Sequence, residues 1–197
     1  MPEGRIRFNT IFVSDKIPDH KQINELAKWC ETFQKMGLTP DFEGKCTGNL
    51  SFRLKGGFVI TASGLETKEN LCGECFVYVK NFEEETNKMF VKGKRNPSSE
   101  AMMHFLIYQT RKDVNAIFHG HNKSILINAN KLGVPVTENE QDFGSIKLAK
   151  EALKVLGENN LVALRNHGFV SVGKTMREAG ELALATLKHS EEMNNTK

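Results

Sequence analysis

The sequence predicts an α/β protein with a single domain, in which helices flank a central, mainly antiparallel β-sheet. Three features lead to this fold class: a segment with helical spacing near the N-terminus, short β-forming runs between residues 49 and 91, and alternating helical and strand patterns after residue 98. The chain has 197 residues, of which 39% are hydrophobic, so it can bury one sizeable core. No repeat or linker divides it, and we expect one domain over residues 1–197.

The first helix is predicted from apolar residues that share one helical face. These residues are Ile23, Leu26, Ala27, Cys30 and Phe33. Asp19 precedes the run as the expected N-cap, and Gly37 follows it at the position where glycine adopts the left-handed conformation that ends a helix. We expect this helix to pack against the core.

The middle of the chain is predicted to form antiparallel strands. Runs rich in β-forming residues alternate with turns that contain Gly, Asn and Glu. The predicted strands are Leu50–Leu54, Phe58–Thr61, Cys75–Lys80 and Lys88–Val91.

Helices and strands alternate in the second half of the chain. The expected helices are Ser98 to about Arg111, a helix after Asn122, Ser145–Leu156 and Thr175–Glu192. The expected strands are Asn115–His119, Leu161–Leu164 and Phe169–Val172.

The composition excludes several classes of function. Lys and Arg number 27 and Asp and Glu 24, an excess too small to predict nucleic-acid binding, although a small anionic ligand remains compatible. No apolar run is long enough to cross a membrane, and Met1–Arg5 lack the apolar core of a signal peptide. The cysteines, Cys30, Cys46, Cys72 and Cys75, are not spaced like a disulfide framework. We therefore expect a cytoplasmic protein with reduced thiols.

Three histidines are candidate metal ligands. His119 and His121 follow an apolar stretch, and residues two apart on a strand point to the same face. His167 follows a second apolar strand. Imidazole nitrogens suit zinc and similar divalent ions, and three protein ligands leave a coordination position open for substrate. For the His-X-His pair alone, two hydrogen-bonded structural histidines are an equally good interpretation.

Small polar turns provide candidate anion ligands. Pro97–Glu100 opens a predicted helix, and serine hydroxyls and free amides at a helix start can bind an anion. Simple capping by Ser98 or Ser99 is the better interpretation of this turn taken alone. Two more such turns, Thr47–Ser51 and Thr61–Gly64, can also be ordinary turn chemistry.

Together these motifs resemble the class II aldolase/adducin family. The family's metal enzymes carry Gly-Asn-[Leu/Val]-Ser, Ile-Thr-X-[Ser/Thr]-Gly, Pro-Ser-Ser-Glu, His-X-His and a later His-Gly, and all five occur here in that order between about Ile23 and Glu192. The resemblance implies a nine-stranded antiparallel sheet flanked by helices, and a homotetramer with active sites at subunit interfaces. The residue roles that it implies are metal binding by His119, His121 and His167, acid/base catalysis by Glu100, and phosphate binding by Asn49, Ser63, Gly64, Ser98 and Ser99.

The implied chemistry is that of a metal-dependent sugar-phosphate aldolase. A Zn²⁺ or another divalent ion that chelates the carbonyl and hydroxyl of a ketose acts as a Lewis acid, so that Glu100 can remove a proton and leave an enediolate held by the metal. Glu rather than Asp at this position favours the aldolase branch by analogy, with cleavage of a ketose 1-phosphate to dihydroxyacetone phosphate and an aldehyde. The alternatives are a dehydratase or epimerase of the same family and a noncatalytic adducin-like module. In a further alternative, Cys72 and Cys75 are a redox pair and the histidines are structural.

The sequence departs from the family in its tyrosines. Several family aldolases carry, between the His-X-His pair and the last histidine, a tyrosine that reaches a neighbouring subunit's active site and protonates the aldehyde oxygen. Here the only tyrosines are Tyr78 and Tyr108, outside that segment. We therefore expect slow aldol turnover unless water, His104, Glu138 or Glu140 supplies the proton.

Overall fold

A computed structural model describes residues 6–195 of the chain, and its central feature is an eight-stranded sheet. Along the sheet the strand order is β1-β7-β6-β5-β4-β8-β10-β9. The strands are β1 Asn9–Ser14, β4 Asn49–Leu54, β5 Gly57–Thr61, β6 Phe76–Glu83, β7 Lys88–Lys92, β8 Ala116–Gly120, β9 Leu161–Leu164 and β10 Gly168–Gly173. β1 and β7 are parallel, and every other pair of neighbours is antiparallel.

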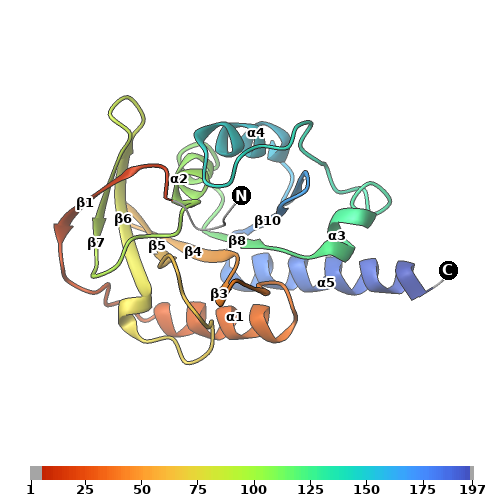
Figure 1. The fold of residues 1–197 in the computed structure, drawn as a ribbon, viewed down its shortest axis with the longest axis horizontal. Coiled ribbons are helices and arrows are strands. Elements are labelled where there is room, and N and C mark those ends of the chain that lie inside the picture. The colour runs from red at the N-terminus through yellow and green to blue at the C-terminus, as the bar shows by residue number, and fades with distance from the viewer. Residues whose placement is uncertain (1–5, 196–197) are drawn as a thin grey trace.

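Helices cover both faces of the sheet (Figure 1). On one face lie α1 (Ile23–Lys35) and α5 (Met176–Asn195), with α3 (Lys123–Asn128) packed against α5. On the other face lie α2 (Ala101–Thr110) and α4 (Ile146–Leu156), which pack against each other. This arrangement confirms the predicted fold class, a mainly antiparallel sheet flanked by helices.

Two details of the sheet differ from the expectation. The described residues form eight strands in the main sheet instead of nine, and two short strands, β2 (Asp41–Phe42) and β3 (Lys45–Cys46), form a separate hairpin. The sequence analysis did not identify β1. This edge strand has no buried residue, so it lacks the alternating apolar pattern by which a strand is recognised.

The first helix ends as predicted but begins differently. Its N-cap is Gln22, which makes no side-chain capping bond, so the prediction of Asp19 was wrong. At the other end, Gly37 has φ +68°, its N–H donates to Gln34 O, and the Leu38 N–H donates to Phe33 O at 2.8 Å. This pair of bonds is a Schellman motif, which only a residue tolerant of positive φ can complete without strain.

The Pro97–Glu100 turn precedes α2 instead of forming its first turn. The helix was predicted from Ser98, but it begins at Ala101, and Glu100 is its N-cap residue. The Ser98 N–H donates to Thr61 O at 3.1 Å, and Ala62 forms a β-bridge with Pro97, so this segment continues the sheet pattern beside the end of β5. The serine turn and the Thr61–Gly64 turn are thereby fixed next to each other.

Two further expectations concern the N-terminal residues and helices that could cross a membrane. Met1–Arg5, for which we predicted no signal-peptide core, lie outside the described residues. Within residues 6–195, no helix combines the length and the apolar character needed to span a bilayer.

Candidate active site

The centre of the sheet brings the three histidines to one end of two neighbouring strands. β8 and β10 are antiparallel with Val170 opposite His119, so the end of β8 meets the beginning of β10. His121 directly follows β8 and His167 directly precedes β10. The two segments are far apart in the sequence, and the strand register alone places their imidazoles together.

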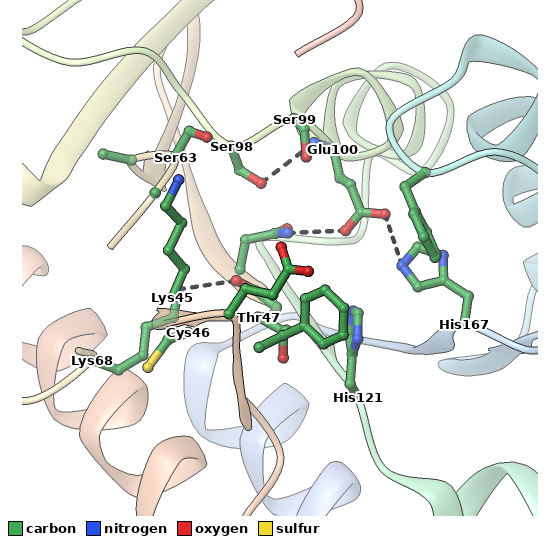
Figure 2. A pocket seen from close by; sticks show the side chains of 17 residues that line it. Lys45, Cys46, Thr47, Ser63, Lys68, Ser98, Ser99, Glu100, His121 and His167 are labelled. Atoms are coloured by element: carbon green, nitrogen blue, oxygen red, sulfur yellow. Dashed lines mark hydrogen bonds and ion pairs between the residues drawn. The ribbon is translucent and has the colours of Figure 1, made fainter. Parts of the chain in front are cut away.

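Glu100 completes a cluster of four possible metal ligands, of which Figure 2 shows Glu100, His121 and His167. His119 Nε2 lies 2.9 Å from His121 Nε2 and 2.8 Å from Glu100 Oε2. His167 Nε2 lies 3.2 Å from Glu100 Oε1. One ligand atom from each of the four residues lies within 4.8 Å of the others. These distances allow a single ion to be held between them.

The hydrogen bonding of His119 fits a bound cation. Its Nδ1 lies 2.8 Å from Phe169 O, and a carbonyl oxygen can only accept, so Nδ1 carries the proton. Nε2 lies within hydrogen-bond distance of a Glu100 carboxylate oxygen and of the His121 ring, and in the neutral ring it offers a lone pair to a cation placed between these groups. Converging lone pairs and a carboxylate are the donor set of a divalent-ion site, and the carbonyl that orients the ring is a common support for such a ligand.

The pKa shifts of these residues keep the cluster in protonation states that favour binding of a cation. Burial lowers the pKa of His167 to about 3, so its imidazole is neutral at pH 7. Burial raises the pKa of the Glu100 carboxyl, but the surrounding imidazoles, His119 first, outweigh this and hold it well below its usual value. The Asn49 amide donates to Glu100 Oε2 at 3.0 Å. Glu100 is therefore a buried carboxylate at neutral pH.

A cavity of about 210 Å³ opens beside the histidine cluster. Among the residues that line it are all five predicted phosphate ligands: Asn49, Ser63, Gly64, Ser98 and Ser99. Glu100, His121 and His167 line the same cavity, and Figure 2 shows Ser63 and Ser98 apart from the two histidines. The structure thus brings every predicted site residue except His119 to the wall of one cavity, and His119 lies directly behind it, bound to Glu100.

Two glycines allow the polar turns to approach the site. Gly64 has φ +67° and Gly48 has φ +69°, a region that side chains disfavour. A Cβ at Gly48 would also lie 2.7 Å from His119 O. Gly48 therefore lets the turn that carries Asn49 lie against the strand that carries the histidine.

The sequence analysis missed several residues that line the cavity: Phe42, Lys45, Lys68 and Phe143. Phe143 packs edge-on against His167, with ring centroids 4.5 Å apart. Lys45 and Phe42 lie on the β2–β3 hairpin and Lys68 lies in the loop after Gly64. None belongs to a periodic pattern or a motif quoted above; Phe42, Lys45 and Lys68 lie within a few residues of a polar turn, and Phe143 had no such signal.

Residues considered as alternative proton donors lie elsewhere. His104 is fully buried, its Nδ1 lies 2.7 Å from Ser51 Oγ, and burial lowers its pKa to about 3. The Tyr108 hydroxyl bonds to the same serine oxygen at 2.8 Å. Glu138 and Glu140 are exposed, and neither these carboxylates nor His104 lines the cavity.

The cysteines of the Cys72–Cys75 segment are free thiols with their Sγ atoms 3.6 Å apart. Cys72 precedes a short 3₁₀ turn, Gly73–Cys75, and Cys75 ends it directly before β6; neither lines the cavity. The arrangement separates them from the histidine cluster.

Comparisons with known proteins agree on one family. The profile described as "Class II Aldolase and Adducin N-terminal domain" matches residues 24–191. The L-fuculose phosphate aldolase of Haemophilus influenzae is 32% identical over 170 residues, covering 78% of this chain and 73% of that protein. The 5-methylthioribulose-1-phosphate/5-deoxyribulose-1-phosphate aldolase of Rhodospirillum rubrum is 29% identical over 70% of this chain and 66% of its own length. A solved L-fuculose 1-phosphate aldolase superposes with a TM-score of 0.73 at 24% identity, covering 91% of this chain and 89% of that one.

Proposed function

This chain belongs to the class II aldolase and adducin family, and from that membership we propose that it is a metal-dependent aldolase that cleaves or forms a ketose 1-phosphate. The observation that carries the proposal is the convergence of Glu100 with His119, His121 and His167 beside a cavity lined by serine and glycine turns. The names of the aldolase relatives specify phosphorylated ketoses as their substrates. A carboxylate, a divalent-ion site and an anion pocket are the parts that such a reaction needs.

The proposed ligands of the ion, most simply Zn²⁺, are His119, His121 and His167. When bound, the ion supplies Lewis-acid polarisation of the ketose carbonyl and its neighbouring hydroxyl. The chain's own residues orient the substrate: Ser63, Gly64, Ser98 and Ser99 would bind its phosphate, which places the carbonyl end of a short ketose at the histidine side of the cavity.

Glu100 is the proposed acid and base. It is 5% exposed and ionised at neutral pH, and it lies within hydrogen-bond distance of two histidines. In the condensation direction it would take the proton from the hydroxymethyl carbon of dihydroxyacetone phosphate, and the resulting enediolate would attack the aldehyde carbon. Glu100 and the neighbouring Asn49 are both buried and hydrogen-bonded to each other, which would limit access of water to the enediolate at this wall of the cavity.

The proposal includes assembly as a homotetramer, as the family resemblance implies. Light scattering coupled to size-exclusion chromatography measures this directly. A monomer in solution would contradict this part without affecting the assignment of the residues.

A dehydratase or epimerase of the same family is the second candidate, and one observation favours it. Neither tyrosine of the chain lines the cavity of its own chain, so this wall offers no tyrosine to protonate an aldehyde oxygen. Elimination of water releases no aldehyde and therefore needs no such proton donor, so the observation favours the dehydratase. An adducin-like module without catalysis is the third candidate, and it predicts neither a bound ion nor turnover.

The test combines product identification with a variant of the base. The purified, metal-loaded protein is incubated with a panel of phosphorylated ketoses, and the products are identified by mass spectrometry. Separately, dihydroxyacetone phosphate is incubated in D₂O with wild type, Glu100→Gln and the exposed control Glu138→Gln. We expect Glu100→Gln to keep its metal and lose proton exchange by at least about 100-fold, the lower range for a general base. Unchanged exchange would place the base elsewhere.

A further inference from the structure

The cavity contains a buried cation that the proposed phosphate ligands do not include. We infer that Lys68, together with Lys45 of the β2–β3 hairpin, forms a cationic subsite that binds the phosphate group of the substrate. The inference rests on the proposed function for the identity of the substrate as a phosphate ester. It adds two charged residues to a set of ligands that is otherwise made of hydroxyls, an amide and backbone.

Lys68 is buried without a carboxylate partner. Its side chain is 2% exposed, and its Nζ donates one hydrogen bond, to Gly48 O at 3.0 Å. Among the described residues no carboxylate lies within ion-pair distance of this ammonium. The ionisable side chains that act on its charge are thiols, Cys30 first, and burial lowers its pKa. An ammonium has three N–H donors, so two remain for a ligand in the cavity.

Burial of an unpaired ammonium is costly, and proteins retain one where an anion compensates it. A purely structural role, in which Lys68 only holds the Gly48 turn, would need one hydrogen bond but no charge. A neutral donor would fulfil that role without the desolvation cost. The wall position of Lys68 in the cavity therefore points to an anionic ligand.

The hairpin fixes Lys45 near Lys68. Its turn residues, Glu43 and Gly44, have φ of 53° and 75°, as two-residue hairpin turns require, and Phe42 pairs with Lys45. The Cys46 N–H donates to Leu65 O at 2.8 Å, which ties the strand after the turn to the loop that leads to Lys68. Both lysines line the cavity as a result.

The two lysines and the two histidines lie at different ends of the cavity. Figure 2 shows Lys45 and Lys68 on the side away from His121 and His167, with Ser63 and Ser98 on the upper wall. Of the two carboxylates that line the cavity, Glu100 is held by His119 and Asn49, and Glu43 is at the exposed tip of the hairpin. A phosphate monoester carries close to two negative charges at pH 7, which two ammonium groups match.

The experiment measures binding of inorganic phosphate to the metal-loaded protein by titration calorimetry. The variants are Lys68→Met, which keeps the length of the stem, Lys45→Glu, and the control Lys188→Met on the exposed face of α5. We expect Lys68→Met and Lys45→Glu each to weaken phosphate binding at least tenfold and the control to leave it unchanged. Metal content, measured on the same samples, should be equal in all four proteins. Because Lys45 is exposed on a surface hairpin, its variant tests the inference even if Lys68→Met does not fold.

The outcomes separate this inference from the proposed function. Wild-type phosphate affinity in both lysine variants overturns the subsite, whether or not the enzyme is an aldolase. Absence of phosphate binding in wild type also overturns it, even if unphosphorylated ketoses are cleaved. Lysine-dependent phosphate binding without turnover of any ketose phosphate supports the subsite and contradicts the aldolase proposal.

Discussion

The two ring nitrogens of His119 have different partners. Nδ1 donates to Phe169 O, and Nε2 faces Glu100 and His121. A ring held in this way presents its lone pair toward the cavity side without any rearrangement, so the backbone of β10 orients a side chain of β8. A metal ion would then find at least one ligand already fixed by the sheet.

At the scale of single residues, we predict that removal of one imidazole causes loss of the metal ion. Wild type should carry about one divalent ion per chain, and His121→Ala should lose it, because two remaining histidines leave too few protein ligands. Elemental analysis of dialysed protein gives the metal content, and His189→Ala, at an exposed position on α5, is the control. Equal metal content in wild type and His121→Ala would exclude His121 as a ligand.

The buried His104 predicts a pH dependence of stability. Its pKa is lowered from 6.5 to about 3 by burial, so the unfolded chain binds a proton between these values and the folded chain does not. Stability contributed by the neutral ring is complete above pH 6.5 and is lost as the pH falls toward 3. At pH 4.5 the loss is about 2–3 kcal/mol relative to pH 7.

Denaturant unfolding of the metal-free protein at these two pH values measures the effect. His104→Gln should flatten the dependence by that amount, and the exposed control His189→Gln should not. A slope in His104→Gln equal to that of wild type would show that His104 is not the group responsible.

At the scale of elements, the site depends on close packing between the ends of β8 and β10. A Cβ at Gly168 would lie 2.4 Å from Gly120 O and 3.0 Å from atoms of the His119 and His121 rings. The strand ends can therefore approach each other only with glycine at this position.

We predict that Gly168→Ala lowers metal affinity by at least tenfold and stability by about 1–3 kcal/mol, the usual cost of overpacking. Competition with a chelator reports the affinity, and denaturant unfolding reports the stability. Gly73→Ala, whose added Cβ would meet Ile17 at 3.0 Å far from the histidines, is the control for crowding alone. A Gly168→Ala protein that is destabilised but binds metal normally would show that the packing does not position the ligands.

The elements that could be predicted are those whose signal lies in a short stretch of sequence. The strand that carries His119 and the strand that precedes His167 were predicted from apolar runs, and the alternation expected of a strand then placed His119 and His121 together. The start of α2 at Ala101 depends on a backbone bond to a distant residue, from Ser98 to Thr61, whereas the α1 start at Gln22 instead of Asp19 involves local bonds such as Ile23 N–H to His20 O. Lys68 could not be predicted, because its burial results from a loop conformation that no sequence period encodes.

At the scale of the whole molecule, we expect the positions of the two tyrosines to set the rate of aldol formation relative to the rate of proton exchange. Tyr108 is buried between Ser51 and Arg53, and burial raises its pKa, while Tyr78 lies on β6 and bonds to Lys55 O. We predict that dihydroxyacetone phosphate exchanges its proton faster than the enzyme joins it to a short aldehyde, by roughly 10²-fold, the lower range for general acid catalysis.

Both rates can be measured on one preparation, by deuterium incorporation and by product formation. Aldol turnover that matches or exceeds exchange would show that another group, or water, delivers the proton without loss. Elimination of water from a ketose phosphate without exchange would instead favour the dehydratase.

The parallel edge strand β1 has a consequence for synthesis of the chain. β1 pairs only with β7, which leaves the ribosome about 75 residues later, a delay of roughly 4 to 15 seconds at ordinary elongation rates. During that time a segment containing Thr10, Ile11, Phe12 and Val13 is translated but has no strand to join, and such segments favour aggregation. Arg7 on one side and Asp15 and Lys16 on the other are charged residues of the kind that keep such a segment soluble, and in the folded protein Arg7 pairs with Asp142 and donates to Phe143 O. These flanking charges would therefore act on the solubility of the nascent chain as well as on the folded protein.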